Sequence, residues 1–82
     1  MIELVLYTRE DCELCHEMEA VIAEVSPKFA TRLERILLDG SPDLEARFGQ
    51  EVPVLFVNGR KAFKYRVTPR ELSKRLAREA RS

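Results

Sequence analysis

The chain has 82 residues, which gives room for one domain, residues 1–82, with a modest core and leaves none for a second domain. Apolar residues make up 45% of the chain, and no apolar run approaches the ~18 residues of a membrane span, so we expect a soluble protein without membrane partners. Net charge is zero, but residues 1–50 carry eleven Asp and Glu against five Lys and Arg, and residues 51–82 carry three against nine. The basic residues lack interleaved exposed aromatics, which argues against nucleic-acid binding.

The first half of the chain predicts a strand, a helix and a second strand. Residues 2–7 form a short, almost continuous apolar run that suits a central strand covered on both faces. Residues 12–25 place apolar side chains at helical spacing with glutamates opposite, and Ser26-Pro27 ends this helix. Residues 31–38 alternate imperfectly; they favour a strand, although a helix fits the same periodicity.

The second half predicts a short helix, a hairpin and a final helix. Residues 41–48 have proline at the first helical position and acids in the first turn. Residues 52–57 and 60–66 read as strands joined by Asn58-Gly59, a dipeptide that favours a type I′ turn. Residues 68–81 begin with a capping box and continue as a helix. The order is β-α-β-α-β-β-α, with the first two strands parallel and the hairpin antiparallel.

The only two cysteines, Cys12 and Cys15, stand three apart where the first strand gives way to the first helix. Thiols at i and i+3 lie on one helix face, near enough for a disulfide. Unpaired N–H groups and the helix dipole favour an anion there, so Cys12 should lose its proton readily, and Cys15 should be more buried. The pattern predicts that Cys12 attacks a disulfide in another molecule and that Cys15 resolves the mixed disulfide.

Three stretches carry a resemblance to a known family. Leu6-Tyr7-Thr8, the motif of residues 12–16 and Val52-Pro53 resemble glutaredoxins, and more closely the short glutaredoxin-like proteins of bacteria. The resemblance implies a thioredoxin-like α/β fold of three layers, in which helices cover a four-stranded mixed sheet. It also implies a thiol-disulfide oxidoreductase that acts in electron transport, without a bound cofactor or metal.

The resemblance also implies a substrate site. The family's proline at the position of Pro53 is cis, lies against the cysteine pair and leaves the backbone of Val52 free to pair with an extended substrate. Proline at the start of a strand fits this place, because it has no N–H for a ladder. We expect Val52, Pro53, Tyr7, Glu13 and Leu14 to contact substrate.

Two departures from the family change the expected chemistry. The usual Pro-Tyr between the cysteines is replaced by Glu13-Leu14, and Glu10, Asp11 and Glu17 add further carboxylates. Negative charge opposes thiolate formation, which shifts the pair toward a reductant. The glycine pair and acidic residue that hold glutathione are missing from residues 63–68. We therefore expect protein disulfides as partners, and glutathione only weakly.

Three other hypotheses stay open at this stage. Residues 12–16 also match the C-x-x-C-H haem attachment motif, with His16 as axial ligand. Cys12, Cys15 and His16 provide at most three metal ligands, so a zinc ion or cluster would have to be shared between two chains. The cysteines could also be incidental in a thioredoxin-like binding or stress module. We expect a cytoplasmic protein, because the sequence opens on a strand pattern without a readable leader. We also expect a monomer.

Overall fold

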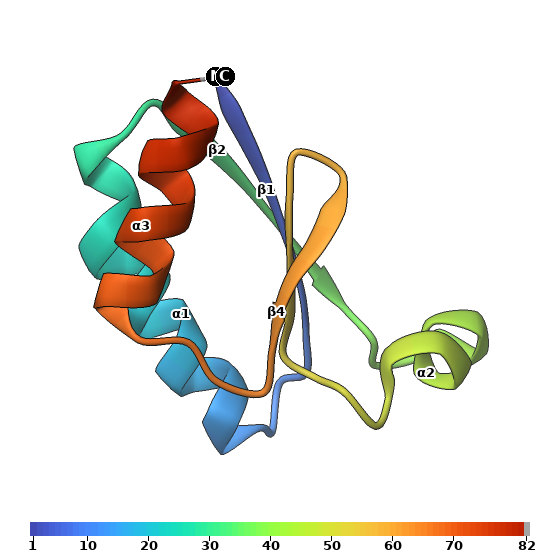
Figure 1. Ribbon diagram of the computed structural model, residues 1–82. Coiled ribbons are helices and arrows are strands. Elements are labelled where there is room, and N and C mark those ends of the chain that lie inside the picture. The colour runs from blue at the N-terminus through green and yellow to red at the C-terminus, as the bar shows by residue number, and fades with distance from the viewer. Residues whose placement is uncertain (82) are drawn as a thin grey trace.

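The computed structural model describes residues 1–81, which build one mixed sheet of four strands (Figure 1). The strands are β1 (Ile2–Thr8), β2 (Thr31–Leu37), β3 (Val54–Val57) and β4 (Arg60–Lys64), in the spatial order β2-β1-β3-β4. β1 pairs parallel with β2 and antiparallel with β3, and β3 and β4 form the hairpin. The predicted strand at residues 31–38 and the predicted topology are confirmed.

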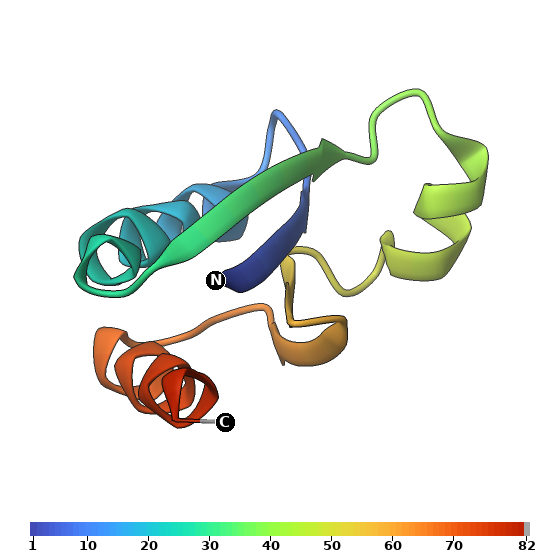
Figure 2. The same ribbon diagram turned by 90° about the horizontal axis from the view of Figure 1, so that it is seen from above.

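Helices lie on both faces of this sheet, as Figures 1 and 2 show. α1 (Glu13–Val25) and α3 (Pro69–Ala80) cover one face side by side, and α2 (Pro42–Phe48) lies against the other near the end of β2. A single 3-10 turn, η1 (Ser26–Lys28), follows α1. The three-layer arrangement is therefore confirmed. Within residues 1–81 there is no helix with the length and apolar content to cross a membrane.

The larger core lies between the sheet and the two long helices. Alternate residues of β1 point into it, and α1 and α3 add their apolar stripes; its buried members are Ile2, Leu4, Leu6, Met18, Ile22, Val25, Leu55, Val57, Val67, Leu72 and Leu76. Full burial of one leucine side chain contributes roughly 1.5–3 kcal/mol. This core therefore provides most of the hydrophobic stabilisation and fixes the start of α1 beside the end of β1.

The opposite face is only partly covered, which differs from the sequence prediction for β1. Glu3 is exposed and Val5 and Tyr7 are half-buried, so β1 alternates and is covered there only at its C-terminal end. α2 has two turns and reaches just this end, where its Phe48 stacks on Tyr7 and its Leu44 packs against the same apolar cluster. The small second core therefore lies directly under the cysteine motif.

Local sequence signals set the turns and the last helix. Asn58 and Gly59 have φ values of 49° and 81°, as a type I′ turn requires. At the start of α3, the Thr68 hydroxyl accepts from the Glu71 N–H at 3.1 Å and the Glu71 carboxylate accepts from the Thr68 N–H at 2.9 Å. The hairpin strands are shorter than predicted, because Pro53 offers no N–H and Tyr65 leaves the extended region with φ of 69°.

Candidate active site

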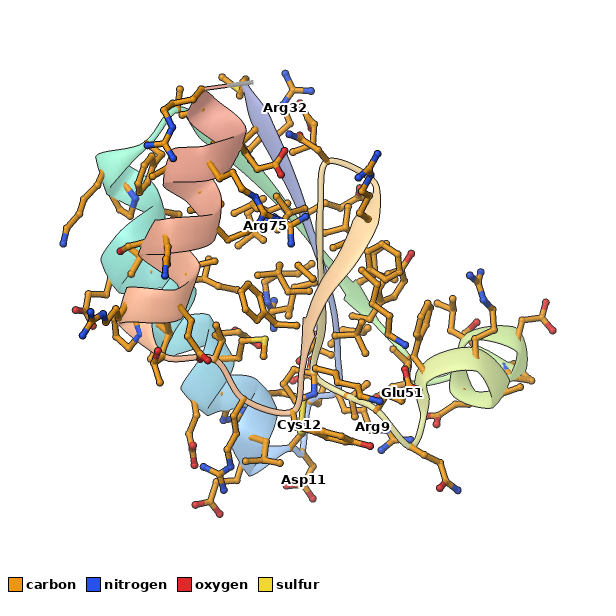
Figure 3. The ribbon with its side chains drawn as sticks, in the orientation of Figure 1. Arg9, Asp11, Cys12, Arg32, Glu51 and Arg75 are labelled. Carbon is orange, nitrogen blue, oxygen red and sulfur yellow. A yellow bond between two sulfur atoms is a disulfide. The ribbon has the colours of Figure 1, made fainter. Side chains whose placement is uncertain are left out.

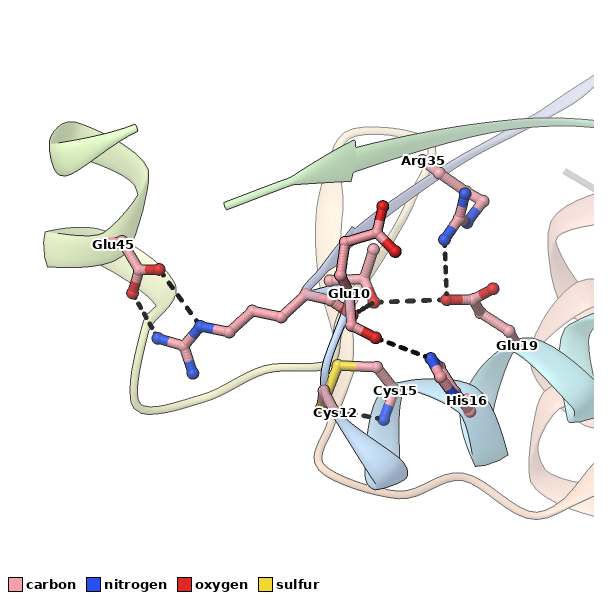
Figure 4. Close-up of a disulfide and its surroundings, with 9 residues drawn as sticks. Glu10, Cys12, Cys15, His16, Glu19, Arg35 and Glu45 are labelled. Carbon is pink, nitrogen blue, oxygen red and sulfur yellow. Dashed lines mark hydrogen bonds and ion pairs between the residues drawn. A yellow bond between two sulfur atoms is a disulfide. The ribbon is translucent and has the colours of Figure 1, made fainter. Parts of the chain in front are cut away.

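Cys12 lies at the junction between the end of β1 and the first turn of α1 (Figures 3 and 4). It is the N-cap of α1, with φ of −147° and ψ of 110°, so it stands just before the first helical residue rather than within it. A disulfide joins it to Cys15, with the two Cα atoms 5.2 Å apart. The structure therefore describes the oxidised form of the pair.

The two sulfur atoms have different surroundings. The Cys15 N–H donates to Cys12 Sγ at 3.2 Å, and the His16 N–H donates to the Cys12 carbonyl at 3.1 Å. Cys15 is fully buried, whereas Cys12 is half-buried. A sulfur at a helix N-cap faces donors and the positive end of the helix dipole, which favours its anionic form. Cys12 is therefore the more accessible of the two sulfurs, and it lies at the N-terminal end of α1.

Three carboxylate residues lie within two positions of Cys12 in the chain. Glu10, Asp11 and Glu13 are all exposed, and within residues 1–81 none of their carboxylates forms an ion pair. Their negative charge opposes the effect of the helix N-terminus. The exposed His16 ring contacts the Glu10 carbonyl at 3.0 Å through Nε2 and thereby holds the loop that precedes Cys12 (Figure 4).

The predicted substrate residues Val52 and Pro53 are both buried. Their peptide bond is cis, as the resemblance implied, and Val52 belongs to the same apolar cluster as Cys15. The Val52 N–H is not free, because it donates to the Phe48 carbonyl at 3.1 Å. Among the described residues no group donates to the Val52 carbonyl. Only one of the two expected main-chain contacts is therefore available.

Tyr7, Glu13 and Leu14 occupy different positions around the motif. The Tyr7 ring stacks on Phe48 at 4.2 Å between centroids and meets the edge of Phe56 at 5.6 Å. It is half-buried in the second core together with both cysteines. Leu14 is half-buried and Glu13 is exposed in the first turn of α1. The fold thus brings Tyr7 and Val52 to the cysteine pair, and places Glu13 and Leu14 on the outer side.

The segment that replaces the expected glutathione-binding glycines is filled by side chains. Tyr65 has φ of 69°, a conformation that glycine adopts more readily than tyrosine. Its hydroxyl donates to the Gln50 carbonyl at 3.1 Å, while its N–H donates to the Pro53 carbonyl at 2.9 Å. Arg66 forms an ion pair with Glu17 of α1 at 3.2 Å. Both side chains are thus engaged within the protein.

Two polar connections near the site were missed from the sequence. The Arg9 guanidinium makes two hydrogen bonds to the Glu45 carboxylate and ties the loop before Cys12 to α2. The buried Thr8 hydroxyl donates to the Glu19 carboxylate at 3.3 Å, and Glu19 also binds Arg35 at 3.2 Å. The partners lie far apart in sequence, so no local pattern indicates them.

Replacing Glu45 with glutamine should lower the urea midpoint of unfolding at pH 7. The Arg9 hydrogen bond holds the pKa of Glu45 below its usual 4.5, so its contribution is complete above that pH and is lost as the pH falls through the lowered value. The difference from wild type should be small, because both side chains are more than a third exposed, and should shrink at pH 3. The exposed Glu24→Gln serves as the control. An equal difference at both pH values would contradict the assignment.

The chain is similar to bacterial proteins, some of which have solved structures. A sequence profile described as "Glutaredoxin-like domain (DUF836)" matches residues 3–77. An uncharacterized protein of Mycobacterium tuberculosis is 31% identical over 78 residues, which covers 89% of this chain and 80% of that protein. A solution structure of protein Ne2328 from Nitrosomonas europaea is 32% identical with a TM-score of 0.75, covering 92% of this chain and 91% of the other.

Further solved structures agree on the architecture. The X-ray structure of protein XcR50 from X. campestris superimposes with a TM-score of 0.79 at 29% identity, covering 92% of this chain and 96% of that one. Oxidised mitochondrial thioredoxin 3 from Saccharomyces cerevisiae gives a TM-score of 0.69 at 17% identity, covering 94% and 77%. At that identity the likeness concerns the fold alone, and it confirms the expected thioredoxin-like arrangement.

Proposed function

Because the chain belongs to the glutaredoxin-like domain family (DUF836) and has a thioredoxin-like fold, we propose that it is a thiol-disulfide oxidoreductase acting on protein disulfides. The observation that carries the proposal is the asymmetry of the cysteine pair. Cys12 is accessible at the cap of α1 and its sulfur accepts a hydrogen bond from the Cys15 N–H, whereas Cys15 is fully buried. This arrangement suits an attacking and a resolving thiol.

In the proposed reaction the reduced protein transfers two electrons to a substrate disulfide. The Cys12 thiolate attacks one substrate sulfur, the substrate S–S bond breaks, and the other substrate sulfur leaves as a thiolate. Cys15 then gives up its proton, and its sulfur attacks Cys12 in the mixed disulfide. The Cys12–Cys15 bond forms, and the second substrate thiolate leaves. A dithiol reductant, itself oxidised to a disulfide, must return the pair to its reduced state.

We propose that substrate docks across the second core as an extended segment. The free Val52 carbonyl can accept one backbone N–H from it, and Pro53 and Tyr7 provide apolar contacts beside the cysteines. Glu13 and Leu14 would meet the substrate on its other side. The Val52 N–H already donates to the Phe48 carbonyl, so Val52 can make only one of two backbone hydrogen bonds to the substrate. Side-chain contacts must therefore provide a larger share of the binding energy.

The surrounding charges support a reducing role in a reducing compartment such as the cytoplasm. Exposed carboxylates next to Cys12 lower the stability of its thiolate relative to a site without them. A reduced form that is stabilised less gives electrons up more readily. The proposed direction is therefore reduction of protein disulfides, as part of electron transport from a dithiol donor.

Comparison of two substrates tests this function. With a dithiol reductant in both assays, the protein should reduce insulin at least about as fast as it reduces a glutathione mixed disulfide. The physical reason is that Tyr65 and Arg66 fill the segment where glutathione would need glycine and free donors. A Lys28→Ala variant, changed far from the site in η1, controls for nonspecific charge effects. A strong, saturable preference for the glutathione adduct would refute the substrate assignment.

A further inference from the structure

The two outer edges of the sheet differ in how well they resist pairing with another strand. β4 has five residues, carries Arg60, Lys61 and Lys64, and is irregular where its pairing with β3 shifts between Leu55 and Phe56. Bulges and lysines of this kind are devices that keep edges from pairing. β2 has seven residues in unbroken register with β1 and forms the other edge (Figure 2). The edge that is open to pairing is therefore β2.

The backbone of β2 offers a regular row of unpaired groups. At the two ends of its pairing with β1, the Ile2 N–H donates to the Ala30 carbonyl at 2.8 Å and the Leu38 N–H donates to the Thr8 carbonyl at 2.9 Å. The N–H and C=O groups of successive residues point to opposite sides of a strand. The even-numbered residues of β2 therefore direct these groups toward β1. Thr31, Leu33 and Arg35 therefore direct their N–H and C=O outward, where no described residue pairs with them.

Four consecutive residues of β2, residues 32–35, are exposed, so side chains on both faces of this strand are accessible. Leu33 is 41% exposed, and Arg32 and Glu34 on the other face are exposed without an ion-pair partner among residues 1–81. Arg35 does not block the edge, because its guanidinium is drawn back onto Glu19 of α1 at 3.2 Å (Figure 4). The β2 edge therefore exposes the apolar Leu33 between Arg32 and Glu34, which carry opposite charges and have no ion-pair partner among residues 1–81.

We propose that β2 pairs antiparallel with β2 of a second copy of this chain, about a twofold axis at Leu33. Leu33 then faces Leu33 of the second copy, and its outward N–H and C=O make two hydrogen bonds. Thr31 faces Arg35 of the second copy in the same hydrogen-bonded way. Residues 32 and 34 form the closer, non-hydrogen-bonded pairs, where side chains interact best.

Charge complementarity selects this register and this partner. Arg32 faces Glu34 of the second copy, and the symmetry repeats the pair, so both unpaired charges find opposite charges. A shift of the axis to Glu34 would instead place Glu34 against its own copy and Leu33 against Arg35, which is unfavourable. The sequence of β2 is therefore complementary to itself in the antiparallel register about Leu33, and a second copy is the partner that fits it.

The proposed dimer differs from the monomer that we expect from the sequence, and its twofold axis lies away from the end of β2 that pairs with Thr8. Figure 3 shows Arg32 and Cys12 at opposite ends of the molecule. Pairing of one seven-residue edge buries an area in the class of weak interfaces, so we expect a dissociation constant on the order of 10–100 μM. The proposal concerns assembly only and is independent of the proposed function.

Sedimentation equilibrium across ~5 μM to ~500 μM tests the dimer by its mass. Wild type should shift from monomer to dimer over this range. Arg32→Glu and Glu34→Arg should each weaken association by about tenfold or more, because each places like charges opposite one another twice. The double variant Arg32→Glu/Glu34→Arg should restore association to within about twofold of wild type, since the exchanged charges pair again.

Arg60→Glu makes the same charge change on the β4 edge and should leave association unchanged. Circular dichroism and thermal melts of all variants confirm that each is folded before its mass is interpreted. A wild-type monomer at every concentration would overturn the proposal. Association that resists both single reversals, or that the double variant fails to restore, would overturn it as well, because either result places the contact elsewhere.

Discussion

Replacing Cys12 with serine is expected to reduce insulin turnover to the background of the dithiol reductant, a loss on the order of 10³-fold or more. A hydroxyl at the α1 cap cannot form the mixed disulfide. Replacing Cys15 with serine should slow turnover in a different way. Cys12 can still attack, but the protein then has no second thiol to resolve the product, so in the absence of added reductant a covalent adduct with substrate should accumulate. Mass spectrometry of the unreduced mixture would detect this adduct.

The two variants also separate the proposed enzyme from the hypotheses that the sequence left open. Because Cys15 is fully buried and Cys12 is not, iodoacetamide should label Cys12 well before Cys15 in the reduced protein. A visible spectrum and a metal assay on protein purified without chelator test haem and metal binding. Equal labelling of the two thiols, or an adduct that forms equally in Cys12→Ser, would sink the assignment of roles. Full cellular function of a Cys12→Ser/Cys15→Ser variant would favour a binding module.

The parts of the fold that could be predicted are those with local causes. Asn58-Gly59 specifies its turn because both residues tolerate positive φ, and Thr68 with Glu71 forms a cap within four residues. The position of Cys12 at the start of α1 likewise follows from a strand pattern that meets a helical one. Chain order, turn chemistry and the cysteine spacing therefore predicted the topology and the place of the cysteine pair at the start of α1.

The parts that could not be predicted depend on contacts between distant residues. The Val52 N–H is used by the Phe48 carbonyl, which follows from how α2 ends and not from the sequence around Val52. The ion pair of Arg9 with Glu45 joins residues 36 positions apart. The exposure of β2 depends on its place at the sheet edge, which hydrophobic periodicity does not reveal. Tertiary packing decides each of these features.

Phe48 links the stability of the domain to the environment of Cys15. It is 4% exposed, stacks on Tyr7, contacts Phe56 edge to face at 5.9 Å and accepts the Val52 N–H through its carbonyl. α2 is the only helix among residues 1–81 that covers this face of the sheet. Removal of the Phe48 ring therefore opens the small core that buries Cys15. Within the part of the chain that the structure describes, no second helix covers this core and could take the place of the ring.

Phe48→Ala should lower the free energy of unfolding by about 3–5 kcal/mol, a large part of the roughly 4–12 kcal/mol expected for a domain of this size. Chemical denaturation measures this loss. Under conditions where the variant is folded, Cys15 in its reduced form should react with iodoacetamide many times faster than in wild type. Phe63→Ala is the matched control, because Phe63 packs against the core beneath α1 and α3; it should destabilise the protein and leave Cys15 protected. Equal protection of Cys15 in both variants would show that Phe48 does not shield the resolving thiol.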